Sequence, residues 1–108
     1  MPNYFALIRK TDPKREHASL VKVDEEMCAH FGVAPHPKLW HAYWHDIIGF
    51  SLACGKTFAQ LIERNEEQAR RDRANGDEDG AKFNDHQVEI LRWLDANFDA
   101  DAWARIGK

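Results

Sequence analysis

Hydrophobic residues recur every three or four positions over residues 37–46, the spacing that gives a helix one apolar face. The stretch opens with Pro37, and proline suits a first helical turn because its missing N–H would have no partner there anyway. Its apolar stripe consists of Leu39, Trp40, Tyr43, Trp44, Ile47 and Ile48. We therefore expect a helix from about Pro37 to Asp46.

Two further helices are predicted from their end signals. The first covers residues 25–31, with Asp24 as its N-cap and Gly32 as its C-terminal stop. The second begins directly after Thr57, because Thr57 and Gln60 have the Ser/Thr-x-x-Glu/Gln spacing of a capping box.

This second helix continues as a charged segment that has almost nothing to bury. Glu66 with Arg70, and Glu67 with Arg71, are i,i+4 pairs in the favourable order, each worth roughly 0.2–0.5 kcal/mol. A solvated helical extension is the simpler interpretation. The alternative is a projecting arm on which Arg70 and Arg71 contact a protein partner.

A last long helix is expected after Asn84 or Asp85, either of which can act as its N-cap. Its apolar face consists of Val88, Ile90, Leu91, Trp93, Leu94 and Phe98. Asp99 or Asp101 then starts a short final turn.

Strand patterns occur in two places. Residues 4–9 are rich in aromatic and branched side chains and precede a turn-like segment. Residues 48–54 alternate large and small side chains with period two, and Gly49 would cost a helix about 1 kcal/mol there. We expect these two strands to pair antiparallel in a mainly helical α+β domain, with an all-α fold as the alternative.

Length and composition narrow the class of protein. The 108 residues suffice for a single domain, residues 1–108, and the formal net charge of −3 gives no strong field toward nucleic acid or anionic lipid. The N-terminus has no secretory pattern, and no apolar run reaches the roughly 18 residues of a membrane span. Cys28 and Cys54 form no Cys-x-x-Cys motif and are expected to be buried thiols. The expected location is the cytoplasm.

The segment Gly49-Phe-Ser-Leu-Ala-Cys-Gly55-Lys56-Thr57 ends like a phosphate-binding loop. That loop needs Gly, four residues and then Gly-Lys-Thr, whereas five residues separate Gly49 from Gly55. The resemblance to P-loop NTPases therefore covers three residues only and does not predict nucleotide hydrolysis. A weaker hypothesis is that Lys56 and Thr57, at the start of the next helix, hold an anion.

A metal site is the best chemical alternative. His41 and His45 lie four positions apart, so on a helix they share a face and could bind one zinc or nickel ion. Further ligands could come from His36, Asp46, His30 or Cys28. The zinc-protease version needs a glutamate beside the first histidine, but residue 42 is alanine, which excludes that chemistry.

Basic residues gather near the N-terminus, where Arg9, Lys10, Lys14 and Arg15 could contact phosphates. No recognisable nucleic-acid motif accompanies them, so we expect a solvated basic edge and keep weak nucleic-acid binding as an alternative.

Protein binding is the favoured function. Trp40, Tyr43 and Trp44 place a large aromatic surface on one short helix, and Trp, Tyr and Arg dominate binding hot spots. No nucleophile lies in a glycine-flanked elbow, so we expect no enzyme. In size and make-up the chain resembles the small orphan proteins of bacteriophages and prophages, a likeness that transfers no residue roles. The sequence thus predicts a non-enzymatic adaptor or inhibitor without a cofactor, with self-association left open.

Overall fold

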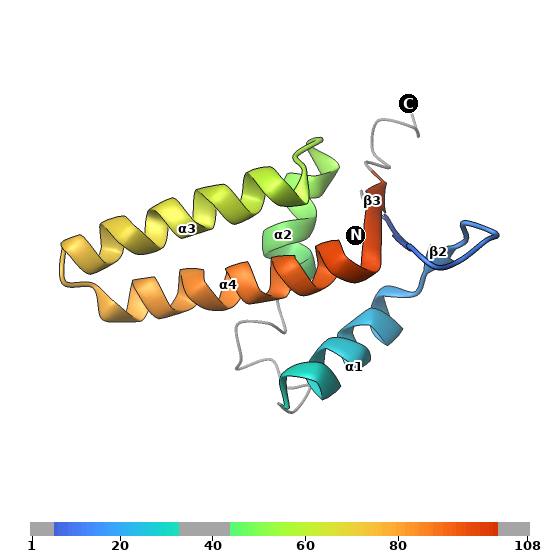
Figure 1. The fold of residues 1–108 in the computed structure, drawn as a ribbon, viewed down its shortest axis with the longest axis horizontal. Coiled ribbons are helices and arrows are strands. Elements are labelled where there is room, and N and C mark those ends of the chain that lie inside the picture. The colour runs from blue at the N-terminus through green and yellow to red at the C-terminus, as the bar shows by residue number, and fades with distance from the viewer. Residues whose placement is uncertain (1–5, 33–43, 102–108) are drawn as a thin grey trace.

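The computed structural model describes residues 6–32 and 44–101, apart from the side chains of residues 44–47, 53 and 101. Four helices and three strands follow one another in these ranges (Figure 1). Their order is β1 Ala6–Arg9, β2 His17–Ala18, α1 Leu20–Phe31, α2 Trp44–Ala53, α3 Phe58–Ala74, α4 Glu78–Asn97 and β3 Phe98–Asp101. The α+β class, mainly helical with a small antiparallel sheet, is confirmed.

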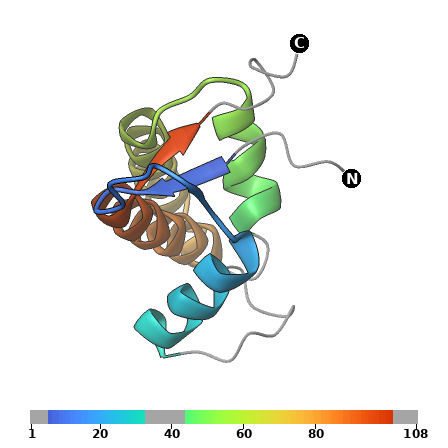
Figure 2. The same cartoon turned by 90° about the vertical axis from the view of Figure 1, so that its right-hand side faces the viewer.

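The sheet has the order β2-β1-β3, with β1 in the centre and antiparallel to both neighbours. Leu7 lies opposite Ala18 on one side and opposite Ala100 on the other. Figure 2 shows β1 and β3 side by side next to α2. The strand predicted over residues 4–9 is confirmed at Ala6–Arg9, and residues 4 and 5 lie outside the described ranges.

The predicted strand over residues 48–54 is wrong, because residues 48–53 belong to α2 and Cys54 lies in the turn that follows it. Ile48 and Leu52 are buried and lie four positions apart on one face of the helix, whereas Phe50 points away from them and is exposed. Alternation of large and small residues fits this helical arrangement as well as a strand. Burial of two large apolar side chains, about 1.5–3 kcal/mol each, outweighs the cost of about 1 kcal/mol for the buried Gly49.

The first helix also starts earlier than predicted. α1 begins at Leu20 with Ser19 as its N-cap rather than after Asp24, and the fully buried Val23 and Met27 anchor one face. The predicted stop is confirmed, since Gly32 caps the C-terminus with a left-handed φ of 69°.

α3 and α4 form an antiparallel helical hairpin, the longest feature of the fold (Figure 1). The predicted capping box is confirmed: Thr57 Oγ1 accepts from Gln60 N at 3.1 Å, and Thr57 N donates to Gln60 Oε1 at 2.9 Å. The helical extension is confirmed as well, because α3 continues to Ala74.

The start predicted for the last helix, at Asn84 or Asp85, is wrong. α4 begins seven residues before Asp85, at Glu78, and Asp77 caps it by accepting a hydrogen bond from Gly80 N at 3.0 Å. Asn84 is instead a buried residue inside the helix. The short tight turn between α3 and α4 makes this early start possible, since α4 packs along α3 from its first turns.

The end of the last helix differs from the prediction too. Phe98 leaves the helix and begins β3, where it is fully buried, and residues 99–101 pair with β1, so no helical turn starts at Asp99. A turn that starts at Asp101 lies outside the described residues. The core joins this strand to all four helices. It consists of Leu7, Val23, Met27, Ile48, Leu52, Phe58, Leu61, Ile90, Leu91, Leu94 and Phe98.

Candidate functional site

The aromatic and histidine residues singled out in the sequence are mostly outside the described ranges. This holds for Trp40, His41 and Tyr43, whereas Trp44 and His45 open α2 without a described side chain. The partner surface at Trp40, Tyr43 and Trp44 and the metal pair His41 and His45 therefore stay predictions. Within residues 6–32 and 44–101, the described side chains form no group of three or more His, Cys, Asp or Glu arranged to hold a metal ion.

The two arginines predicted on a partner-binding arm lie on the exposed surface of α3. Arg71 pairs with Glu67 over 2.6 Å, as its spacing predicts. Arg70 does not pair with Glu66, because that carboxylate instead binds Arg92 of α4 at 2.8 Å. Arg70 is thus a cation that the described side chains leave uncompensated, and its contact with a partner stays a prediction.

Lys56 and Thr57 line a surface pocket of about 320 Å³ between the end of α2, the start of α3 and β3. The Thr57 hydroxyl is already used by the capping box, which leaves Lys56 as the group that could attract an anion. Asp95 and Asp99 line the same pocket, and each is paired with a cation from the segment between β1 and β2. Anion binding at Lys56 and Thr57 stays a prediction.

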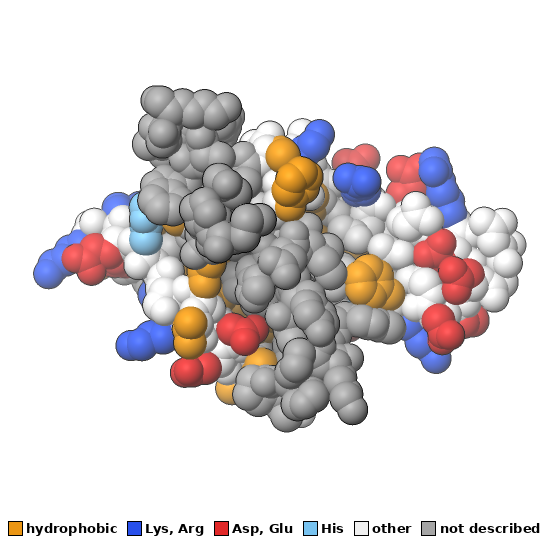
Figure 3. Space-filling view, turned by 180° about the vertical axis from the view of Figure 1, so that it is seen from behind, with side chains coloured by type: hydrophobic (Ala, Val, Ile, Leu, Met, Phe, Trp, Pro, Cys, Tyr) orange, Lys and Arg blue, Asp and Glu red, His pale blue; other side chains and the backbone are white. Residues whose placement is uncertain are grey.

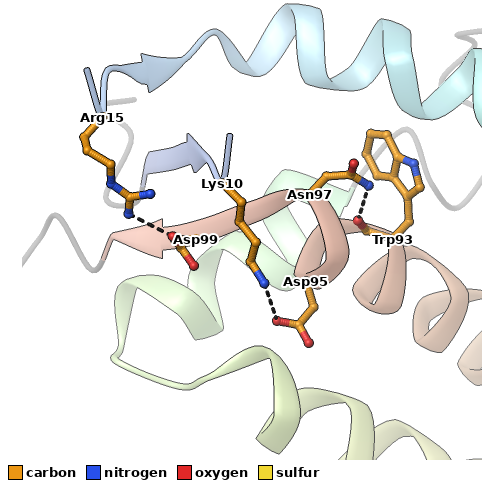
Figure 4. A network of polar contacts seen from close by, with 6 residues as sticks. All are labelled: Lys10, Arg15, Trp93, Asp95, Asn97 and Asp99. Atoms are coloured by element: carbon orange, nitrogen blue, oxygen red, sulfur yellow. Dashed lines mark hydrogen bonds and ion pairs between the residues drawn. The ribbon is translucent and has the colours of Figure 1, made fainter. Parts of the chain in front are cut away.

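The N-terminal basic cluster is compensated by carboxylates from distant parts of the chain. Figure 4 shows two of these ion pairs. Lys10 Nζ lies 3.9 Å from Asp95 Oδ1, and Arg15 Nη2 lies 2.8 Å from Asp99 Oδ2. These exposed ion pairs link the segment between β1 and β2 to α4 and to β3. Because two of the four cluster cations are neutralised here, the surface is less suited to phosphates than the sequence alone indicates.

A third cluster cation, Arg9, forms a bidentate pair with Glu26 of α1, with N–O distances of 2.9 and 2.5 Å. The hydrogen bond from Arg9 lowers the pKa of the Glu26 carboxyl below its ordinary value, against a smaller opposing effect of burial. The Arg9 guanidinium also lies 5.3 Å from the centre of the Phe98 ring. Arg9 therefore links α1 to the sheet, and its role in the described structure is to stabilise the fold.

A cavity of about 270 Å³ opens between α2, α3 and α4, and its wall is mainly polar. Gln87 of α4 contributes to this wall although its side chain is almost completely buried, with 1% exposed. Neither Gln87 Nε2 nor Gln87 Oε1 has a hydrogen-bond partner among the residues that the structure describes. Buried polar atoms are nearly always satisfied, so this side chain marks the most unusual chemical environment of the described chain.

Hydrogen bonds between side chains of α3 and α4 support that wall. Asp72 of α3 accepts hydrogen bonds from Gln68 Nε2 and from Asn84 Nδ2, both at 2.9 Å. Gly80 permits this arrangement, because a Cβ atom there would lie 2.8 Å from Asp72 Oδ2 and 2.5 Å from Asp77 Oδ2. Sequence reasoning missed the site, although one signal was present: Asn84 and Gln87 occupy helical positions continuous with the apolar stripe of Leu91.

Large apolar side chains are exposed at two separate places. Phe50 on α2 and Val21 on α1 are large hydrophobic residues with 72% and 69% of their surface exposed. Cys54 is exposed as well, which corrects the expectation that both thiols are buried, whereas Cys28 is buried as predicted. On the face of the molecule in Figure 3, hydrophobic side chains reach the surface between charged ones. The interpretation of residues 48–54 as a strand concealed the exposure of Phe50.

None of the described helices combines the length and the apolar character needed to cross a bilayer. Comparison of the chain with protein-family models, with curated proteins and with solved structures gives no match.

Proposed function

We propose that this chain is a non-enzymatic protein-interaction protein of the adaptor or inhibitor kind, acting in the cytoplasm, whose partner contacts α2 at Phe50. The observation that carries the proposal is the exposure of this aromatic ring, 72% of whose surface is accessible. Covering a phenylalanine side chain is worth about 1.5–3 kcal/mol, so a partner that encloses the ring gains considerable affinity from one residue.

The position of Phe50 on its helix supports this assignment. Ile48 and Leu52 use the opposite face of α2 for the core, so the helix is held in place without any contribution from Phe50. Cys54, one helical turn further on, is exposed too. A partner can therefore cover this side of α2 without disturbing the packing beneath it. Arg70, which no carboxylate compensates among the described residues, is a second proposed contact, with an acidic group of the partner.

Affinity capture from the cells that naturally produce the chain tests this proposal. The bait is the full chain, compared with Phe50→Ser and with Val21→Ser, which removes another large hydrophobic residue exposed in the described part of the chain. We expect a stoichiometric protein retained by the unaltered chain and by Val21→Ser, and reduced at least tenfold by Phe50→Ser. Circular dichroism establishes that both variants are folded.

Two results contradict the proposal. One is recovery of chaperones alone, and the other is a partner lost equally with both variants. If the captured protein is a second copy of the chain, sedimentation must show that Phe50→Ser converts the oligomer to monomer.

A further inference from the structure

The described side chains of α2 contact the rest of the protein without hydrogen bonds or ion pairs. This holds for residues 48–52 in the described part of the chain. The helix also runs across α3 and α4 rather than along them, so the helices meet over a short length (Figure 1, Figure 2). By contrast, the ion pairs of Arg73 with Asp85 and of Arg92 with Glu66 join α3 to α4.

Apolar burial is what favours the docked position of α2. Ile48 and Leu52 are 3% and 1% exposed, and they belong to the same core as Leu91 and Leu94 of α4. Removing their apolar surface from water stabilises the contact between α2 and the hairpin.

Gln87 of α4 opposes that position. It lies one helical turn before Leu91, and it lines the cavity of about 270 Å³ together with Ile48 and Ser51 of α2. Its side-chain nitrogen and oxygen are both sealed from solvent and have no hydrogen-bond partner among the described residues. Unpaired buried polar atoms are unfavourable, and both atoms would gain hydrogen bonds to water if α2 moved away.

The turn after α2 contains a residue that can absorb such a movement. Gly55 has a left-handed φ of 89°, and glycine adopts both signs of φ without steric cost. The backbone hydrogen bonds of this turn run from Gly55 N to Leu52 O and from Lys56 N to Ser51 O, both at 3.0 Å. They lie within α2 and the turn, so they do not depend on the docking of α2 against α3 and α4.

We propose that α2 undocks from α3 and α4 while the rest of the fold stays intact, and that the unpaired amide of Gln87 makes this opening frequent. In the open state Gln87 is hydrated, and Ile48 and Leu52 become accessible in addition to Phe50. The two positions of α2 therefore present different surfaces, one with its apolar face concealed and one with it available. The opening is a property of the chain alone and does not depend on a partner at Phe50.

Hydrogen exchange of the ¹⁵N-labelled full chain, followed by NMR at several urea concentrations, tests the opening. The amide protons of Phe50, Ser51 and Leu52 should have protection factors at least about tenfold lower than those of Ile90 and Leu91 in α4. Exchange in α2 should accelerate with urea, because undocking exposes apolar surface, but less steeply than exchange in α4, which requires global unfolding.

Variants at position 87 show whether Gln87 controls the opening. Gln87→Leu removes both unpaired polar atoms and should slow exchange of the α2 amides at least about fivefold. Gln87→Met keeps the length of the side chain and should act in the same direction. Glu89→Gln, at an exposed position of the same helix, is the control and should leave exchange in α2 within about twofold of the unaltered chain.

The proposal is overturned if the α2 and α4 amides share one protection factor and one urea dependence, because α2 then opens only on global unfolding. Exchange in α2 that does not respond to urea would also overturn it, since fraying of a helix end exposes little surface. Unchanged exchange of the α2 amides in both Gln87→Leu and Gln87→Met has the same consequence. So does failure of both variants to fold, because the amide would then stabilise the docked position.

Discussion

Asn84 Nδ2 of α4 donates a hydrogen bond to Asp72 Oδ2 of α3 over 2.9 Å. The same nitrogen donates to the carbonyl oxygen of Gly80, and Asp72 also accepts from Gln68, so four residues form one network across the hairpin. This network links the two helices at the wall of the Gln87 cavity.

A double-mutant cycle measures this coupling. Asp72→Ala and Asn84→Ala should each lower the free energy of unfolding by about 1–3 kcal/mol, because each leaves polar partners unpaired. The double variant should lose at least about 0.5 kcal/mol less than the sum, as measured by urea unfolding. Glu67→Ala with Arg71→Ala, an exposed pair on α3, is the control and should show coupling below about 0.5 kcal/mol. Additive losses at Asp72 and Asn84 would contradict the network.

Truncation of Phe98 and truncation of Phe50 should lower the stability of the fold to very different extents. Phe98→Ala should lower the free energy of unfolding by about 3–5 kcal/mol, because the ring is fully buried in the core. Phe50→Ala should change it by less than about 0.5 kcal/mol, because that ring is largely exposed. Thermal or urea unfolding of the two variants measures both changes. Similar losses at both positions would mean that Phe50 is packed in solution.

The two thiols should differ in reactivity. Cys54 is exposed, whereas Cys28 is buried and burial raises the pKa of its thiol, which reduces the reactive thiolate. A disulfide reagent should therefore modify one cysteine of the native chain at least about tenfold faster than the other. Cys54→Ser should abolish the fast phase and Cys28→Ser should retain it; the reverse pattern would refute this placement.

The Arg9–Glu26 pair should make stability depend on pH in the acid range. Because the folded-state pKa of Glu26 lies below its ordinary value of 4.5, its contribution is complete above about pH 4.5 and is lost as the pH falls through the folded value. The pair is exposed, so the effect should be about 0.2–1 kcal/mol. The stability difference between the unaltered chain and Glu26→Gln should shrink from pH 7 to pH 3. In an Arg9→Gln background most of this pH dependence should be absent, and its full persistence would assign it to other groups.

Local signals predicted the features that depend on neighbouring residues. The Thr57–Gln60 capping box and the stop at Gly32 are confirmed because each involves only a few consecutive residues. Pairing between strands that lie far apart in the sequence could not be predicted from such local signals. The acidic segment Phe98–Asp101 has no clear strand pattern, and it becomes β3 because β1 offers a free edge beside it.

The candidate sites, too, depend partly on neighbouring residues and partly on how distant elements pack. Exposure of Phe50 could not be read from its neighbours, because a seven-residue alternation of large and small side chains fits both a strand and a helix. The polar residues Asn84 and Gln87 interrupt an apolar stripe and could have been noticed. The other residues that line the same cavity come from α2 and α3, however, and only the packing of three helices brings them together.

Photo-crosslinking from position 50 tests most directly whether α2 contacts a protein partner. A photoreactive phenylalanine analogue replaces Phe50 in one sample and Val21 in another, and both samples are irradiated in the cells that produce the chain. We expect a discrete crosslinked protein from position 50 and at least tenfold less of it from position 21. Absence of any crosslink from position 50, or equal yields from both positions, would contradict it.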